Sequence, residues 1–169
     1  MRSTDSACKN RKDINAELCN AIGATYDSTL DLSVKDSVNK YGRYDLIFEA
    51  TGYSPIIFEA MQTLNENGIL ILASVTGGDR TTDNVPSDLI NQEFVLGNRL
   101  MVGTVNANRE HFEMGVRDLA LSEAMYKGWL ARMITHRVSG LEDFKDVFRI
   151  LDEGGDNGAI KTILEIADL

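Results

Sequence analysis

Cysteine and histidine are scarce in this chain of 169 residues, which contains two of each. Cys8, Cys19, His111 and His136 are scattered, and no pair of them has the spacing of a zinc site. The sequence therefore predicts no metal site within the chain. Two cysteines without a secretory signal are also typical of a reduced, intracellular protein.

Long apolar runs and an excess of basic residues are absent as well. No apolar run approaches the roughly 20 residues that span a bilayer, and residues 1–6 lack the apolar segment of an export signal. The formal net charge of −9 argues against the basic surface that nucleic-acid binding requires. We therefore expect a cytoplasmic protein with neither a membrane nor a nucleic acid as its partner.

Expected strands alternate with expected helices along the chain. Helical spacing is clear at Leu141, Phe144 and Leu151, whereas the run 69–73 is continuously apolar, as in a strand covered on both faces. Ser54 is expected to cap the helix that follows it. The alternation predicts an α/β fold of the doubly wound Rossmann type with a mostly parallel sheet. Helices are expected at 14–22, 54–66, 86–94, 109–123 and 141–151, and strands at 24–26, 44–50, 69–73, 99–105, 134–138 and 159–166.

A basic turn stands out near the start of this acidic chain. Residues 9–12 carry three cations in four positions and resemble a turn that grips a 2′-phosphate. Taken alone, such a run is more often a solvated turn. The G-x-G-x-x-G loop that cradles the pyrophosphate in dinucleotide-binding domains does not precede it. The sequence thus predicts one incomplete nucleotide-binding domain over 1–169 that lacks its first βα unit.

Small and polar residues follow three of the expected strands. These segments are Ala50-Thr51-Gly52, Ala73-Ser74-Val75-Thr76 and Thr104-Val105-Asn106. Because the carboxyl ends of parallel strands lie along one edge of a sheet, all three segments are expected to face a single crevice. For any one of them alone, the turn that must follow a strand is the better explanation.

Taken together, these segments resemble the archaeal glucose 1-dehydrogenases, which belong to the zinc-dependent medium-chain dehydrogenases. The stretch 44–52 (YDLIFEATG) is similar to their segment that ends in Glu/Asp-Ala-Thr-Gly. The stretch 102–112 (VGTVNANREHF) is similar to their Gly-x-Val-Asn…His-Phe segment. Residues 10–13 resemble their basic turn, and 160–162 resemble their last strand. The resemblance covers about residues 8–168 in the same order.

The resemblance implies oxidation of an aldose at C1 with NADP or NAD as the cofactor. Arg11 is expected to contribute most, because a guanidinium can engage phosphate oxygens through two hydrogen bonds. Lys12 stands where the family has a second arginine. A lysine keeps the positive charge but cannot form the paired hydrogen bonds of a guanidinium. Asn106 is expected to reach toward substrate hydroxyls as well. The implied cofactor-binding residues are Asn10, Arg11 and Lys12 at the adenosine ribose and 2′-phosphate, and Ala73, Ser74, Val75, Thr104, Val105 and Asn106 on the nicotinamide side.

No catalytic residue is assigned within the chain. His111 lies in the first turn of an expected helix, and we predict a capping or packing role for it. His136 lies on an expected strand without a neighbouring acid or nucleophile. In the resembled family the zinc, its ligands and most sugar-binding residues come from an N-terminal domain, which nothing here matches. We therefore expect a chain truncated at its N-terminus that lacks turnover by itself.

The sequence is compatible with three functions. The first is the C-terminal cofactor-binding portion of an aldose dehydrogenase, with a return segment at about 134–169; the complete enzyme transfers hydride from sugar C1 to NAD(P)+. The second is a non-catalytic binding or assembly module, or an inactive gene fragment, that associates through an exposed sheet edge. A third, an unrelated nucleotide-binding sensor, leaves Asn106 unexplained. The expected partners are the nucleotide, the aldose, and a second copy or the missing N-terminal half.

Overall fold

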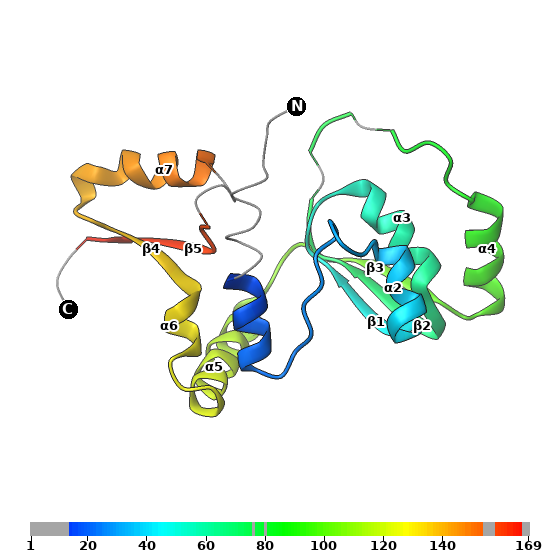
Figure 1. The fold of residues 1–169 in the computed structure, drawn as a ribbon, viewed down its shortest axis with the longest axis horizontal. Coiled ribbons are helices and arrows are strands. Elements are labelled where there is room, and N and C mark those ends of the chain that lie inside the picture. Colours follow the sequence, from blue (N-terminus) through cyan, green and yellow to red (C-terminus); the bar gives the residue numbers. More distant parts are fainter. Residues whose placement is uncertain (1–13, 76, 80, 154–157, 167–169) are drawn as a thin grey trace. The chain divides into compact units, whose positions relative to one another are not determined.

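The structure is a computed structural model that describes residues 14–75, 77–79, 81–153 and 158–166 (Figure 1). It divides into two compact units. We call residues 28–107 the three-stranded unit, and the described residues of 1–27 and 108–169 the two-stranded unit. No helix in the described ranges is long and apolar enough to cross a membrane.

The three-stranded unit is built from βαβ crossovers around one parallel sheet. Its strands lie in the order β1-β2-β3, and both neighbouring pairs are parallel. Glu49 of β1 lies opposite Leu72 of β2, which in turn lies opposite Gly103 of β3, so the three carboxyl ends are level. The expected α/β fold with a parallel sheet is confirmed. The elements are α2 (Val34–Tyr41), β1 (Tyr44–Glu49), α3 (Ser54–Thr63), β2 (Leu64–Leu72), α4 (Ser87–Leu96) and β3 (Leu100–Gly103).

The core of the three-stranded unit lies on one face of this sheet. Leu64 and Leu70 are fully buried and pack with Ala60 of α3. Ile47 and Phe94 pack against this cluster from β1 and α4. Figure 1 shows α2 and α3 on the same side of the strands.

The opposite face of the sheet is apolar and exposed. Leu46, Ile69 and Leu100 are register partners and are 61%, 37% and 51% exposed. Phe48 and Val102 lie two residues further along β1 and β3, and they are 64% and 41% exposed. The expectation that 69–73 is covered on both faces is therefore wrong for the described structure. The continuous apolar run reflects one packed face and one apolar face that the helices of residues 28–107 leave open.

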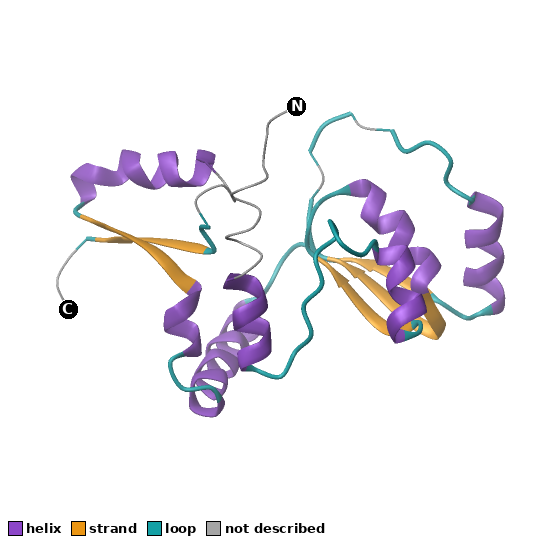
Figure 2. Ribbon diagram, viewed as in Figure 1, coloured by secondary structure: helices purple, strands orange, loops and turns teal. Residues whose placement is uncertain are grey.

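The two-stranded unit is also α/β. Strands β4 and β5 pair in parallel (Figure 2). The helix at 14–21 joins this unit through Trp129, whose indole N–H donates to the carbonyl of Leu18 at 2.9 Å. Further elements of the unit are α5 (Arg109–Met125), α6 (Trp129–Met133), β4 (Ile134–Ser139), a 3-10 turn (Leu141–Asp143), α7 (Phe144–Glu153) and β5 (Lys161–Glu165).

Three local expectations differ from the structure. Residues 24–26 form no strand, because the chain leaves the helix at Gly23 and pairs with no neighbouring strand there. Strand β2 begins at Leu64, inside the range 54–66 expected to be helical, because Leu64 already pairs with Tyr44. Tyr53 occupies the N-cap position of α3 without a side-chain capping hydrogen bond, and Ser54 is the first helical residue.

Candidate functional site

The residues that follow the three strands of the sheet lie along one edge. The N–H of Ala73 donates to the carbonyl of Glu49 at 2.9 Å, and the N–H of Thr104 donates to the carbonyl of Leu72 at 2.9 Å. The ladder therefore continues one residue beyond β2 and β3. The parallel topology brings together the segments that begin at Ala50, Ala73 and Thr104, as the sequence predicts. Their binding role stays a prediction.

The turn after β1 is held in shape by its own residues. Gly52 has φ +66°, in the left-handed region that favours glycine. A Cβ at this position would lie 3.0 Å from the Ser74 hydroxyl oxygen and 3.0 Å from the Val75 carbonyl oxygen. Glycine at 52 therefore lets the turns after β1 and β2 approach closely.

Side chains at this edge are open to solvent. Val75 is 80% exposed and Val105 is 78% exposed, and Thr104 and Asn106 are exposed with them. Ser74 is half-buried. The edge thus offers amide and hydroxyl groups for hydrogen bonds and exposed valines for a flat ring. The other predicted cofactor residues, Asn10, Arg11 and Lys12, lie outside the described residues.

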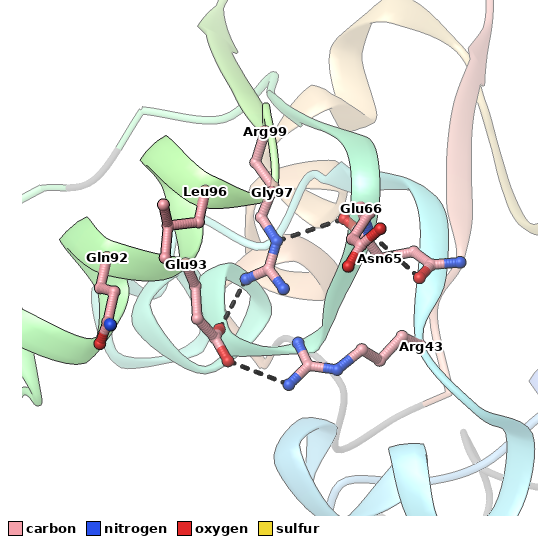
Figure 3. Close-up of a pocket in the computed structure, with 8 residues that line it drawn as sticks. All are labelled: Arg43, Asn65, Glu66, Gln92, Glu93, Leu96, Gly97 and Arg99. Atoms are coloured by element: carbon pink, nitrogen blue, oxygen red, sulfur yellow. Dashed lines mark hydrogen bonds and ion pairs between the residues drawn. The ribbon is translucent and has the colours of Figure 1, made fainter.

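A hollow of about 340 Å³ lies at the opposite, amino-terminal edge of the sheet. Figure 3 shows two guanidinium groups directed at the Glu93 carboxylate in this hollow. Arg99 donates to Glu93 at 2.6 Å and Arg43 donates to it at 3.1 Å. This cluster could not be predicted from the sequence, because Arg43 and Glu93 are fifty positions apart.

The same two arginines hold the end of helix α3. Arg43 donates at 3.0 Å to the carbonyls of Gln62 and Leu64. Arg99, whose side chain is 5% exposed, donates at 3.2 Å to the carbonyl of Asn65. These carbonyls lie where a helix leaves acceptors without helical partners. Because both guanidinium groups already donate to several protein acceptors, we interpret the cluster as a structural clamp.

Glu93 is held ionised by the clamp. Burial by itself would raise the pKa of Glu93, but the hydrogen bonds from Arg99 and Arg43 outweigh burial and lower the pKa below its usual value of 4.5. Because the arginines and Glu93 already bond protein groups, the opposite edge of the sheet, with its open amides and hydroxyls, is the better candidate for ligand binding.

The predicted structural role of His111 is confirmed. Its backbone N–H donates to the side-chain oxygen of Asn108 at 2.9 Å, and its ring Nδ1 accepts from the N–H of Asn108 at 3.3 Å. The two residues form a reciprocal cap at the start of α5. His136 contacts the hydroxyl of the adjacent Thr135 at 3.1 Å. Among the residues with described positions, no group of three or more His, Cys, Asp or Glu is arranged to hold a metal ion.

Replacing Asn108 by alanine removes this cap. We expect the free energy of unfolding to fall by about 1 kcal/mol, the usual cost of losing an N-cap side chain. Chemical denaturation measures the loss. Ser122→Ala, which removes an exposed hydroxyl bonded within the same helix, serves as the control and is expected to change stability by less than about 0.5 kcal/mol. Equal losses for the two variants would contradict a capping role.

Comparison with known proteins agrees with this fold. The family model described as the glucose dehydrogenase C-terminus matches residues 2–166. The chain belongs to this family. It is 34% identical to the glucose 1-dehydrogenase of Methanocella arvoryzae over 160 residues, which make up 95% of this chain and 43% of that protein. The chain thus spans less than half the length of this relative.

Solved structures give the same result. The crystal structure of glucose dehydrogenase from Haloferax mediterranei matches with a TM-score of 0.75 and 27% identity, over 92% of this chain and 41% of that one. The same enzyme in complex with NADP, Zn and gluconolactone matches equally well. The 2R,3R-butanediol dehydrogenase of Bacillus subtilis, at 16% identity and a TM-score of 0.67, shares the fold. In its sequence and its fold, the chain is similar to the C-terminal region of these glucose dehydrogenases.

Proposed function

We propose that this member of the glucose dehydrogenase C-terminus family binds NADP or NAD at the carboxyl edge of the three-stranded sheet. The observation that carries the proposal is the level alignment of the three strand ends, with Gly52 packed against Ser74 and Val75. Ligands of open α/β sheets bind outside the carboxyl ends of the strands. The Haloferax mediterranei enzyme, a structural relative, is solved with NADP.

The assignment of residues to the nucleotide follows the strand ends. Ala73, Ser74 and Val75 would contact the nicotinamide side, with Thr104 and Val105 beside them. Asn10, Arg11 and Lys12 would hold the adenosine ribose and its 2′-phosphate. Asn106 would reach the nicotinamide side and the hydroxyls of an aldose.

The reaction belongs to the complete enzyme in this proposal. Bound NADP+ or NAD+ supplies the acceptor for a hydride from sugar C1, and this chain supplies the positioning of the nucleotide. The Haloferax mediterranei relative is solved with zinc, but the described residues of this chain offer no cluster of donors that fits a metal ion. Residues 1–169 are proposed to act as one nucleotide-binding domain, with 134–169 as its return segment.

The proposal is tested by titrating the chain with NADPH and following the nucleotide fluorescence. We expect saturable binding by the wild-type chain. Arg11→Ala is expected to weaken NADPH binding by about tenfold to a hundredfold, because hydrogen bonds between charged groups contribute about 1.5–3 kcal/mol. Arg117→Ala removes an arginine of helix α5 and is expected to leave the affinity unchanged. Folded wild-type protein that binds neither NADPH nor NADH would contradict the proposal.

A second candidate function is supported by the apolar face of the sheet. Leu46, Phe48 and Leu100 are each more than half exposed, and contiguous apolar surface of this kind marks sites of association. An assembly module would associate tightly in the absence of nucleotide. Sedimentation of the wild-type chain beside Phe48→Lys tests this: association that Phe48→Lys abolishes would favour the module, and a monomer would exclude it.

A further inference from the structure

Glu49 carries a buried carboxylate at the carboxyl end of β1. It is 3% exposed, and of the other described polar residues only Thr63 is also buried. Its Oε1 accepts hydrogen bonds from the N–H of Thr51 at 2.6 Å, the hydroxyl of Thr51 at 2.5 Å and the N–H of Gly52 at 3.1 Å. One carboxylate oxygen therefore accepts three hydrogen bonds from Thr51 and Gly52.

The other carboxylate oxygen of Glu49 has no partner. Its Oε2 is buried and accepts no hydrogen bond in the described part of the chain. A buried acceptor without a donor lowers the stability of a fold, and native proteins keep few of them. Stabilisation of the sheet alone does not account for a carboxylate at this position.

Glu49 also connects two of the strand ends. Its main-chain carbonyl accepts from the N–H of Ala73 at 2.9 Å, where the segment after β2 begins. Its side chain fixes Gly52, and a Cβ on Gly52 would contact Ser74 and Val75 at 3.0 Å. Glu49 thus contacts both the turn after β1 and the start of the segment after β2.

We propose that Glu49 is a positioning residue for nucleotide binding. Its carboxylate holds Thr51 and Gly52 so that the turn after β1 lies closely against Ser74 and Val75, and this arrangement forms the edge that receives the nucleotide. Glu49 acts through the turn and does not touch the reacting atoms. This inference rests on the proposed function, because the ligand is the same nucleotide at the same edge.

The test compares Glu49→Ala with Glu49→Gln by NADPH titration of the full chain. Glu49→Ala removes the acceptor of the turn and is expected to weaken NADPH binding at least tenfold. Glu49→Gln keeps a side-chain oxygen in place of Oε1 and is expected to bind within threefold of wild type. Thr63→Val is the matched control, because Thr63 is also buried and donates to the Ala60 carbonyl within the core. It is expected to lower the melting temperature without changing the affinity of the folded protein.

A second measurement follows the local stability of the turn after β1 in the absence of nucleotide. Amide hydrogen exchange of Thr51 and Gly52 is expected to accelerate at least tenfold in Glu49→Ala and to stay slow in Glu49→Gln and Thr63→Val. This readout separates a loosened turn from a general loss of stability, which would accelerate exchange in the sheet core as well.

Different outcomes overturn different claims. Wild-type chain that binds no nucleotide would overturn the proposed function, and the role of Glu49 in binding with it. Wild-type binding with an unchanged affinity in Glu49→Ala would overturn the role of Glu49 alone. Equal weakening of NADPH binding by Glu49→Ala and Thr63→Val would also overturn it, since the effect would then follow from stability.

Discussion

Replacing Glu93 by alanine is expected to lower the free energy of unfolding by about 2–3 kcal/mol, the usual cost of leaving a buried charged donor without its acceptor. Glu93 accepts from Arg99 at 2.6 Å and from Arg43 at 3.1 Å, and the Arg99 side chain is 5% exposed. The alanine variant leaves a buried guanidinium without its carboxylate. Urea denaturation followed by circular dichroism measures the change.

An exposed ion pair provides the control for this prediction. Arg109 and Glu113 pair at 2.7 Å on helix α5 with side chains 91% and 54% exposed. Glu113→Ala is expected to cost less than about 0.5 kcal/mol, because exposed pairs are weak. A loss of less than about 1 kcal/mol for Glu93→Ala would contradict the clamp.

The clamp also predicts how stability depends on pH. The arginines lower the pKa of Glu93 in the folded protein, so its contribution is present above the unfolded-state pKa near 4.5. The contribution is lost as the pH falls through the lower, folded-state value. The stability difference between wild type and Glu93→Gln is therefore expected to be constant near neutral pH and to shrink below about pH 4.5. A difference that stays constant down to pH 3 would contradict the shift.

Replacing Gly52 by alanine is expected to affect both stability and nucleotide binding. A non-glycine residue at φ +66° costs about 1–2 kcal/mol, and crowding of a packed region adds about 1–3 kcal/mol. The new methyl group would meet the backbone oxygen of Val75 at 3.0 Å, so the turns after β1 and β2 must separate. We expect NADPH binding to weaken at least tenfold. Chemical denaturation and fluorescence titration measure the two effects.

Gly23→Ala is the control that measures backbone strain without crowding. It has φ +77°, but a Cβ there would meet no atom within 4 Å. Gly23→Ala is therefore expected to cost only the backbone term of about 1–2 kcal/mol and to leave NADPH affinity unchanged. If Gly52→Ala binds NADPH as the wild type does, close approach of the two turns is not needed for binding.

The order of elements could be read from the sequence because local patterns determine it. The helical spacing and the apolar runs placed β1, β3, α5 and β4 close to their observed bounds. The alignment of the three strand ends followed from parallel topology, which the alternation of elements implies. The cap formed by Asn108 and His111 is also local, since its two members are three residues apart.

The remaining features depend on contacts between distant residues. The longer strand β2 results from the pairing of Leu64 with Tyr44, twenty residues earlier, with a shift of register between Tyr44 and Leu46. The clamp joins Arg43 to Glu93 across fifty residues. Glu49 is a different case: its partners are two and three residues away, but sequence does not show that its side chain turns back toward them.

The central claim is that the nucleotide binds at the carboxyl edge of the three-stranded sheet. The most direct test is NADPH titration of 15N-labelled chain with the amide shifts mapped onto the structure. We predict saturable shifts at Thr51, Gly52, Ser74, Val75 and Val105. Shifts confined to the opposite edge, around the hollow that Glu93 lines, would contradict the account.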